Sequence, residues 1–204
     1  MARTQAERSA ATQRALLTAA RRLWGERGYA EVSTPEIAEA AGVTRGAMYH
    51  QYADKAALFR AVIEAMDQEI LERLEATVAA ARPKTPADTM HAMAEAWIDI
   101  AGEPEVRQLM LQDAASVIGW REYRDMSQRN SVERAEELLR AAIEAGEIRP
   151  QPLRPLALVV LGALEEAAMY LAGAEDPVQA RDEIRAVIRD LIDGLLTGPA
   201  RRRG

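Results

Sequence analysis

The sequence contains no cysteine and only two histidines, His50 and His91. Without thiols the chain can form neither a disulfide nor a thiolate metal site. A serine-type catalytic triad would have to take its base from one of the two imidazoles. The chain also lacks a Walker loop, a GxGxxG fingerprint and an HExxH zinc motif. We therefore expect a protein that is not an enzyme and that holds no cofactor and no metal ion.

Aromatic residues and long apolar runs are also scarce. Aromatic side chains make up 4% of the residues, and no apolar run approaches the roughly 20 residues that cross a bilayer. The first residues, MARTQAERSAATQR, lack the apolar core of a signal peptide. About half of the chain is apolar, and the dominant Ala, Leu, Glu and Arg favour helix over strand. These features predict an all-α cytoplasmic protein with no membrane partner.

Charge is distributed unevenly along the chain. Residues 1–60 contain nine Lys and Arg against six Asp and Glu, a net charge of +3, whereas residues 61–204 have a net charge of −9. A basic front on an acidic body indicates that only the front meets a polyanion. Solvated charge runs are common, so the charge pattern alone fits that alternative equally well.

Three helical segments are expected before residue 54, a first over about residues 8–27 and then two short ones. The first ends at Gly28, which we expect in the left-handed αL conformation. The second begins at Ser33, which forms a capping box with Glu36 three residues later. Gly42 ends the second helix, and Thr44 is the expected N-cap of the third.

The third helix has two chemically different faces. At about 100° per residue, Met48 points to one side and polar residues cover the opposite arc. Two short helices that meet at a glycine turn, the second with an exposed polar face, predict a helix-turn-helix. Its second helix would lie in the DNA major groove. The polar arc consists of Arg45, Gly46, Tyr49 and His50.

From residue 55 onward the pattern is again helical. A long helix over residues 55–81 precedes the break ARPKTPAD, which contains two prolines. We divide the chain into a helix-turn-helix domain (1–54), a second helical domain (55–200) and a basic tail (201–204).

The last two predicted helices are expected to form a dimer interface. Residues 154–173 are apolar almost all round, so this helix must be covered on more than one side. The helix after it carries an apolar stripe opposite its charges. The alternative is that both helices pack within a single bundle. The predicted interface residues are Leu158, Leu161, Glu165, Ile184, Val187, Ile188, Leu191 and Leu195.

Methionine and tryptophan in the C-terminal part suit an adaptable apolar ligand pocket. Glu165 and Glu166 lie within an apolar helix, where a carboxylate either caps the dimer seam or meets a polar group of a ligand. The residues predicted to line the pocket are Met66, Met93, Trp97, Met110, Trp120, Glu166 and Met169.

His91, Glu95 and Asp99 recur at i, i+4 and i+8, so they share one helix face. This face is either a metal site or a solvated charged surface. We favour the solvated surface because Met90, Met93 and Trp97 are expected on the opposite, core-facing side of the helix.

Residues 28–62, GYAEVSTPEIAEAAGVTRGAMYHQYADKAALFRAV, resemble the DNA-binding module of TetR-family (tetracycline-repressor-like) transcriptional regulators. The family often has Tyr-x-His-Phe where this chain has Tyr49-His50-Gln51-Tyr52. The matching features are Gly28–Tyr29, STPEIA and AGV, followed by Gly46, Met48, Tyr49, Tyr52, Lys55 and Leu58.

The resemblance implies a homodimer that binds a palindromic operator, with repression as the default output. It also implies that residues 55–200 form a ligand-binding and dimerisation domain whose small-molecule ligand, as yet unknown, releases the DNA. One rival interpretation is a helical ligand-binding protein that no longer binds DNA. Another is a small all-α enzyme that uses Glu165 or His91, for which the sequence supplies no motif.

The resemblance assigns roles to the residues around the third helix. Arg45 is the first choice for reading guanine O6 and N7, the alternatives being a phosphate contact or a solvated side chain. Tyr49 and His50 are expected on phosphate or sugar, and Gly46 lets the backbone approach DNA closely. Lys55 is expected on a phosphate. The full predicted set is Ser33, Thr34, Thr44, Arg45, Gly46, Tyr49, His50 and Lys55.

Overall fold

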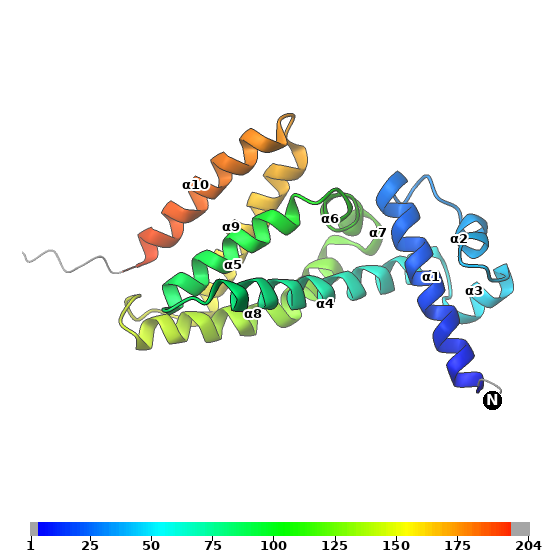
Figure 1. Cartoon of the computed structure of the whole chain (residues 1–204), viewed down its shortest axis with the longest axis horizontal. Helices are drawn as coiled ribbons and strands as arrows, with labels where there is room; N and C mark the ends of the chain where they lie inside the picture. Colours follow the sequence, from blue (N-terminus) through cyan, green and yellow to red (C-terminus); the bar gives the residue numbers. More distant parts are fainter. Residues whose placement is uncertain (1–3, 197–204) are drawn as a thin grey trace, which may run out of the picture. The chain divides into compact units, whose positions relative to one another are not determined.

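The structure, a computed structural model, describes residues 4–196 and is built of helices joined by short connections (Figure 1). This confirms the all-α prediction; the predicted basic tail, 201–204, lies outside the described residues. The helices are α1 (Gln5–Arg27), α2 (Thr34–Ala40), α3 (Arg45–Gln51), α4 (Lys55–Ala81), α5 (Pro86–Ala101), α6 (Pro104–Val106), the π-helix η1 (Arg107–Asp113), α7 (Ala114–Ile118), α8 (Trp120–Glu144), α9 (Leu153–Gly173) and α10 (Pro177–Leu195).

The helix starts follow local sequence signals. α1, α2 and α5 each begin with a capping box at Thr4, Ser33 and Thr85. The N-cap hydroxyl accepts from the backbone N–H three residues later, and the carboxylate of that later residue accepts from the N-cap backbone N–H. Proline occupies the first turn of α2, α5 and α10, where its missing N–H has no helical partner to lose. The predicted capping box at Ser33 is therefore confirmed.

The chain divides into two compact units. Among the described residues, unit 1 comprises 4–68 and 104–123, and unit 2 comprises 69–103 and 124–196. This division differs from the boundary that we predicted after residue 54. The reason is that the first turns of α4 supply Leu58 and Phe59, both fully buried, to unit 1.

An aromatic cluster occupies the core of unit 1. The rings of Trp24, Tyr29 and Phe59 lie with their centroids 5.0–5.5 Å apart in tilted or edge-to-face arrangements. Such pairs stabilise a fold by about 0.5–1.5 kcal/mol beyond the burial of their area. The cluster joins the end of α1, the loop after it and the start of α4.

Polar contacts hold the segment 104–123 against α1 within unit 1. The Arg21 guanidinium donates two hydrogen bonds to the Glu105 carboxylate, at 2.9 and 2.8 Å. The Tyr29 backbone N–H donates to the Asp113 carboxylate at 2.9 Å. Gly28 ends α1 as predicted, but with φ +81° and ψ 161° it lies outside the αL region. A Cβ at Gly28 would also meet the Gln108 amide nitrogen at 3.1 Å, so glycine is required there.

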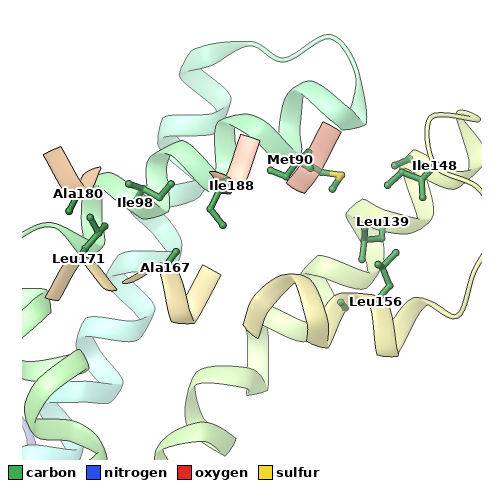
Figure 2. Close-up of a cluster of buried hydrophobic side chains, with 13 residues drawn as sticks. Met90, Ile98, Leu139, Ile148, Leu156, Ala167, Leu171, Ala180 and Ile188 are labelled. Carbon is green, nitrogen blue, oxygen red and sulfur yellow. The ribbon is translucent and has the colours of Figure 1, made fainter. Parts of the chain in front are cut away.

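The core of unit 2 joins α5, α9 and α10 with the end of α8 (Figure 2). Ile188, which we expected at a dimer interface, instead belongs to this core and is 4% exposed. Because α10 packs against α5 and α9, its apolar stripe is partly used inside the chain. The side chains labelled in Figure 2 are Met90, Ile98, Leu139, Ile148, Leu156, Ala167, Leu171, Ala180 and Ile188.

The charged face of α5 is partly exposed, and it also pairs with α10, which we did not predict. The arginines of α10 reach the carboxylates of α5 because the two helices pack against each other. Within residues 4–196 no group of three or more His, Asp or Glu side chains is arranged to hold a metal ion. The pairs are His91–Asp193 at 3.0 Å, Arg189–Glu95 and Arg185–Glu95 at 2.9 Å, and Arg185–Asp99 at 2.5 Å.

Candidate nucleic-acid interface

The turn between α2 and α3 is short and depends on Gly42. This residue has φ +67°, and its own N–H donates to the Glu39 carbonyl at 2.9 Å. An L-residue in this conformation costs roughly 1–2 kcal/mol, so glycine suits the position. The Val43 N–H donates to the Ala38 carbonyl at 2.9 Å, and Thr44 then caps α3 by accepting from the Ala47 N–H. The chain therefore reverses within a few residues and starts α3 beside α2.

The two faces of α3 lie as the sequence predicts. Met48 is fully buried under the helix, where it packs in unit 1. On the opposite side Arg45, Gly46 and His50 are exposed, and Tyr49 is 41% exposed. These polar side chains are free to meet a large partner without unfolding the domain.

Tyr49 connects α3 to α2 and also contacts Arg45. Its hydroxyl lies 3.2 Å from the Thr34 hydroxyl. The Arg45 guanidinium lies over the Tyr49 ring, 5.6 Å from its centroid. The hydrogen bond with Thr34, followed by that with Arg45, lowers the pKa of Tyr49. The pairing of Thr34 with Tyr49 was not predicted, because the two residues are 15 positions apart in different helices.

The Ser33 hydroxyl is engaged inside its capping box. It donates to the Glu36 carboxylate at 2.7 Å, and the Ser33 backbone N–H donates to the same oxygen at 2.8 Å. These bonds, with one from Arg27, lower the pKa of Glu36 to about 2. Ser33 therefore has a structural role at the start of α2.

Lys55 points into unit 1 in this structure. Its ammonium donates to the Tyr29 carbonyl at 2.6 Å and lies over the Tyr29 ring, 4.1 Å from the centroid. Desolvation by burial lowers the pKa of Lys55. The predicted phosphate contact would use the remaining N–H donors of this ammonium group.

Gln51 departs from the family pattern, and the structure gives it a partner. Its side chain exchanges hydrogen bonds with the Ser9 hydroxyl of α1, at 3.0 and 3.3 Å. Gln51 therefore ties the end of α3 to α1, a packing role that we did not predict because Ser9 lies 42 positions away.

The residues predicted to line a ligand pocket are divided between the two units. Met66 and Met110 lie in the core of unit 1, where they are 1% and 4% exposed. Met93 and Trp97 are half-buried on α5 of unit 2, and the Trp97 indole N–H donates to the Leu164 carbonyl at 3.0 Å. The remaining predicted pocket residues, Trp120, Glu166 and Met169, are exposed.

Exposed apolar side chains gather on α9 and α10 of unit 2. Val159 is 68% exposed on α9, and Val187 and Leu191 are 57% and 39% exposed on α10. Burial raises the pKa of Glu165, although the Arg124 charge opposes this shift. The other predicted interface residues apart from Ile188 are half-buried, namely Leu158, Leu161, Glu165, Ile184 and Leu195.

α9 also has the length and composition to cross a membrane. Its most apolar 18-residue window has a mean hydropathy of 1.6, and 28% of that window is buried. We expected no such segment because no apolar run approaches the roughly 20 residues that cross a bilayer. A core helix of a soluble protein meets the same criterion, so this finding is weak evidence of insertion.

A shallow hollow of about 420 Å³ lies in unit 2, where α9 ends and α10 begins. The Tyr170 hydroxyl donates to the Glu183 carboxylate at 2.9 Å beside it, which raises the pKa of Tyr170. Of the predicted pocket residues, Met169 alone is among its described lining. The hollow is lined chiefly by Met169, Tyr170, Gly173, Asp176, Gln179 and Glu183.

Known proteins are similar to this chain along nearly its whole length. The HTH-type transcriptional regulator AcrR of Shigella flexneri is 28% identical, over 99% of this chain and 97% of its own length. The crystal structure of a TetR-family transcriptional regulator from Pectobacterium atrosepticum is 34% identical. It matches with a TM-score of 0.85 and covers 97% of this chain and 100% of its own. RolR in complex with its ligand resorcinol, at 22% identity, a TM-score of 0.69 and coverage of 95% and 99%, has the same fold.

Two family models match separate parts of the sequence. Residues 16–62 match the model of bacterial regulatory proteins of the tetR family. Residues 87–195, more than half of the 204, match the tetracyclin repressor-like C-terminal domain. The helix-turn-helix described above falls within the first match, and the core of unit 2 falls largely within the second. The chain therefore belongs to the TetR family of transcriptional regulators.

Proposed function

We propose that this protein is a cytoplasmic, homodimeric repressor that binds a palindromic operator and leaves it when a small molecule binds the C-terminal helices. The observation that carries the proposal is the exposed polar face of α3, which stands opposite the buried Met48. A seven-residue helix held by a cap at one end and a core methionine below can enter a major groove as a rigid element.

The residues of this face suit the chemistry of DNA. The planar fork of Arg45 can pair with guanine O6 and N7, a contact worth about 1–3 kcal/mol of discrimination. Tyr49 and His50 are exposed beside it and would contact phosphate or sugar. Gly46 leaves the backbone bare on the same surface, and Thr34 and Thr44 offer hydroxyls nearby.

A second copy of the chain would cover the exposed apolar side chains of α9 and α10. Val159, Val187 and Leu191 are more exposed than apolar side chains of this size usually are in a folded protein. A two-fold axis through this surface makes the operator palindromic, with half-sites about one helical turn, roughly 34–36 Å, apart.

Ligand release would act through α4, because this helix belongs to both units. A ligand that displaces the part of α4 in unit 2 would move the part that begins at Lys55 in unit 1. The spacing of two recognition helices would then no longer match the operator. RolR, which has the same fold, is known in complex with resorcinol, and this supports a small organic ligand. Met93 and Trp97 remain predicted pocket residues.

Selection from random DNA duplexes at low salt tests the proposal. We expect an enriched palindrome for the wild type and a loss of preference at one symmetric base pair in Arg45→Ala. Arg129→Ala is a matched control, because Arg129 is exposed on α8 far along the chain from α3. Failure to enrich any palindrome would favour the rival interpretation, a ligand-binding protein without DNA-binding activity.

A further inference from the structure

Thr34 and Tyr49 form a link between the two helices of the helix-turn-helix. Thr34 is the first residue of α2, and Tyr49 lies in the second turn of α3. Their hydroxyl oxygens are 3.2 Å apart. The Tyr49 side chain is 41% exposed, and the bond with Thr34 holds its hydroxyl end.

The Tyr49 ring in turn carries the Arg45 side chain. The two residues are one turn apart on α3, the spacing at which helix side chains meet. The Arg45 guanidinium lies 5.6 Å from the ring centroid, within the range of a cation–π contact. A free arginine side chain populates many rotamers, and a base-reading arginine must select the few that align its fork with a guanine edge.

We propose that Thr34 is a positioning residue for base reading, acting through Tyr49 to orient the Arg45 guanidinium toward a guanine of the operator. The inference rests on the proposed function and adds a specificity determinant to it. Thr34 would thus set how well Arg45 discriminates bases without touching a base itself.

The alternative for Thr34 is direct contact with phosphate. That role would use the Thr34 hydroxyl, which in this structure is directed at the Tyr49 hydroxyl. The lowered pKa of Tyr49, caused first by Thr34 and next by Arg45, supports a connected set of three side chains. The two roles differ in their consequences, because a phosphate contact changes the salt dependence of binding and a positioning contact changes base discrimination.

The first test uses the free protein. We would measure the heteronuclear NOE of the Arg45 Nε–H group by NMR in wild type, Thr34→Val, Thr34→Ser and Tyr49→Phe. The Arg45 guanidinium should be ordered in the wild type and mobile in Thr34→Val and Tyr49→Phe. In Thr34→Ser its order should return to that of the wild type. Thr18→Val, an exposed threonine of α1, and Tyr52→Phe are the matched controls and should leave it unchanged.

The second test uses the selected operator, with 7-deazaguanine or adenine at the base pair that Arg45→Ala identifies. Thr34→Val should lower discrimination at this pair by about three- to tenfold, with an unchanged salt slope and unchanged affinity for random DNA. Thr34→Ser should restore the wild-type ratio.

Three outcomes overturn the inference. Equal mobility of Arg45 in wild type and Thr34→Val would do so, whether or not the protein binds DNA. So would a salt slope that falls by about one in Thr34→Val while discrimination stays constant, since that marks a phosphate contact. A protein that orders Arg45 as described but selects no DNA sequence would instead refute the proposed function, and with it the base-reading role of the three residues.

Discussion

Gly46 leaves the backbone of α3 uncovered on the face that carries Arg45 and Tyr49. A Cβ at Gly46 would meet only the Thr44 hydroxyl oxygen, at an ordinary 3.9 Å, so the fold has room for alanine. Glycine inside a helix costs about 0.5–1 kcal/mol relative to alanine. The chain gives up this stability at a position where the proposed DNA partner would approach most closely.

Gly46→Ala is therefore expected to stabilise the fold and weaken operator binding. The free energy of unfolding in urea should rise by about 0.5–1 kcal/mol because alanine has less backbone entropy to lose. The operator affinity, measured by fluorescence anisotropy, should fall in the same variant. Unchanged affinity together with raised stability would show that no close contact is made at this position.

The lowered pKa of Glu36 makes the stability of the helix-turn-helix depend on pH. Its pKa is lowered from 4.5 to about 2, chiefly by the two bonds from Ser33 and then by that from Arg27. A carboxylate with a depressed native pKa stabilises the fold above its unfolded pKa, and this contribution is lost as the pH falls toward the native value. Wild type should thus exceed Glu36→Gln in urea midpoint at pH 6, and the difference should shrink between pH 4.5 and 2. A difference that stays constant over this range would contradict the assignment.

At the scale of elements, α5 and α10 are joined by a polar seam beside the apolar core of unit 2. Arg185 is its central member, since it reaches both Glu95 and Asp99. Its side chain is 28% exposed, whereas that of Arg189 is 58% exposed. The ion pairs of the less exposed Arg185 should contribute more to the free energy of unfolding, because water screens them less.

Arg185→Ala should lower the free energy of unfolding by about 1 kcal/mol at low salt. The loss should become smaller in 1 M NaCl, where the Debye length is only about 3 Å. Chemical denaturation at both salt concentrations measures the effect, and Arg189→Ala is the matched control with the smaller expected loss. Equal losses in the two variants would contradict the argument that the less exposed arginine contributes more to stability.

The elements that the sequence predicted well are those fixed by neighbours in the chain. Ser33 and Glu36 are three residues apart, and Gly42, Thr44 and Met48 follow within one turn and one short helix. Their backbone bonds and helical spacing can be worked out locally. The helix-turn-helix and the two faces of its second helix could therefore be predicted from these residues without any tertiary contact.

The contacts that the sequence did not predict join residues far apart in the chain. His91 pairs with Asp193, 102 positions away, and Lys55 meets the Tyr29 carbonyl, 26 positions away. The apolar stripe of α10 indicates that this face of the helix is covered, but it does not indicate which neighbour covers it. Ile188 was therefore assigned to the wrong surface. The π-helical turn of η1 was also missed, because its residues fit an ordinary α-helical pattern.

At the scale of the whole molecule, the proposed dimer depends on the apolar side chains left uncovered on α9 and α10. Val159 lies on α9 and Val187 on α10, and neither is among the buried residues of the unit 2 core. A stable homodimer buries at least about 1,000 Å² in a patch of this kind. Changing these side chains should alter assembly without altering the fold of one chain.

The double variant Val159→Asp, Val187→Asp is expected to be monomeric at concentrations at which the wild type is a dimer. Burying two charges on each side of a two-fold interface brings like charges together and leaves them desolvated. Sedimentation velocity measures the assembly state, and far-ultraviolet circular dichroism checks that the helices remain. Ala76→Glu, at an exposed position of α4, is the control for an added charge. A variant that remains dimeric would place the interface on another surface.

In the loop that follows α1, both backbone polar groups of Tyr29 are hydrogen-bonded. The Tyr29 N–H donates to Asp113, and the Tyr29 carbonyl accepts from Lys55. An amide in a loop normally exchanges its proton with solvent quickly. The Tyr29 amide can exchange only when its hydrogen bond to the Asp113 carboxylate breaks. Deuterium uptake at Tyr29 would thus report how often residues 104–123 separate from the loop after α1, in a sample that contains neither DNA nor ligand.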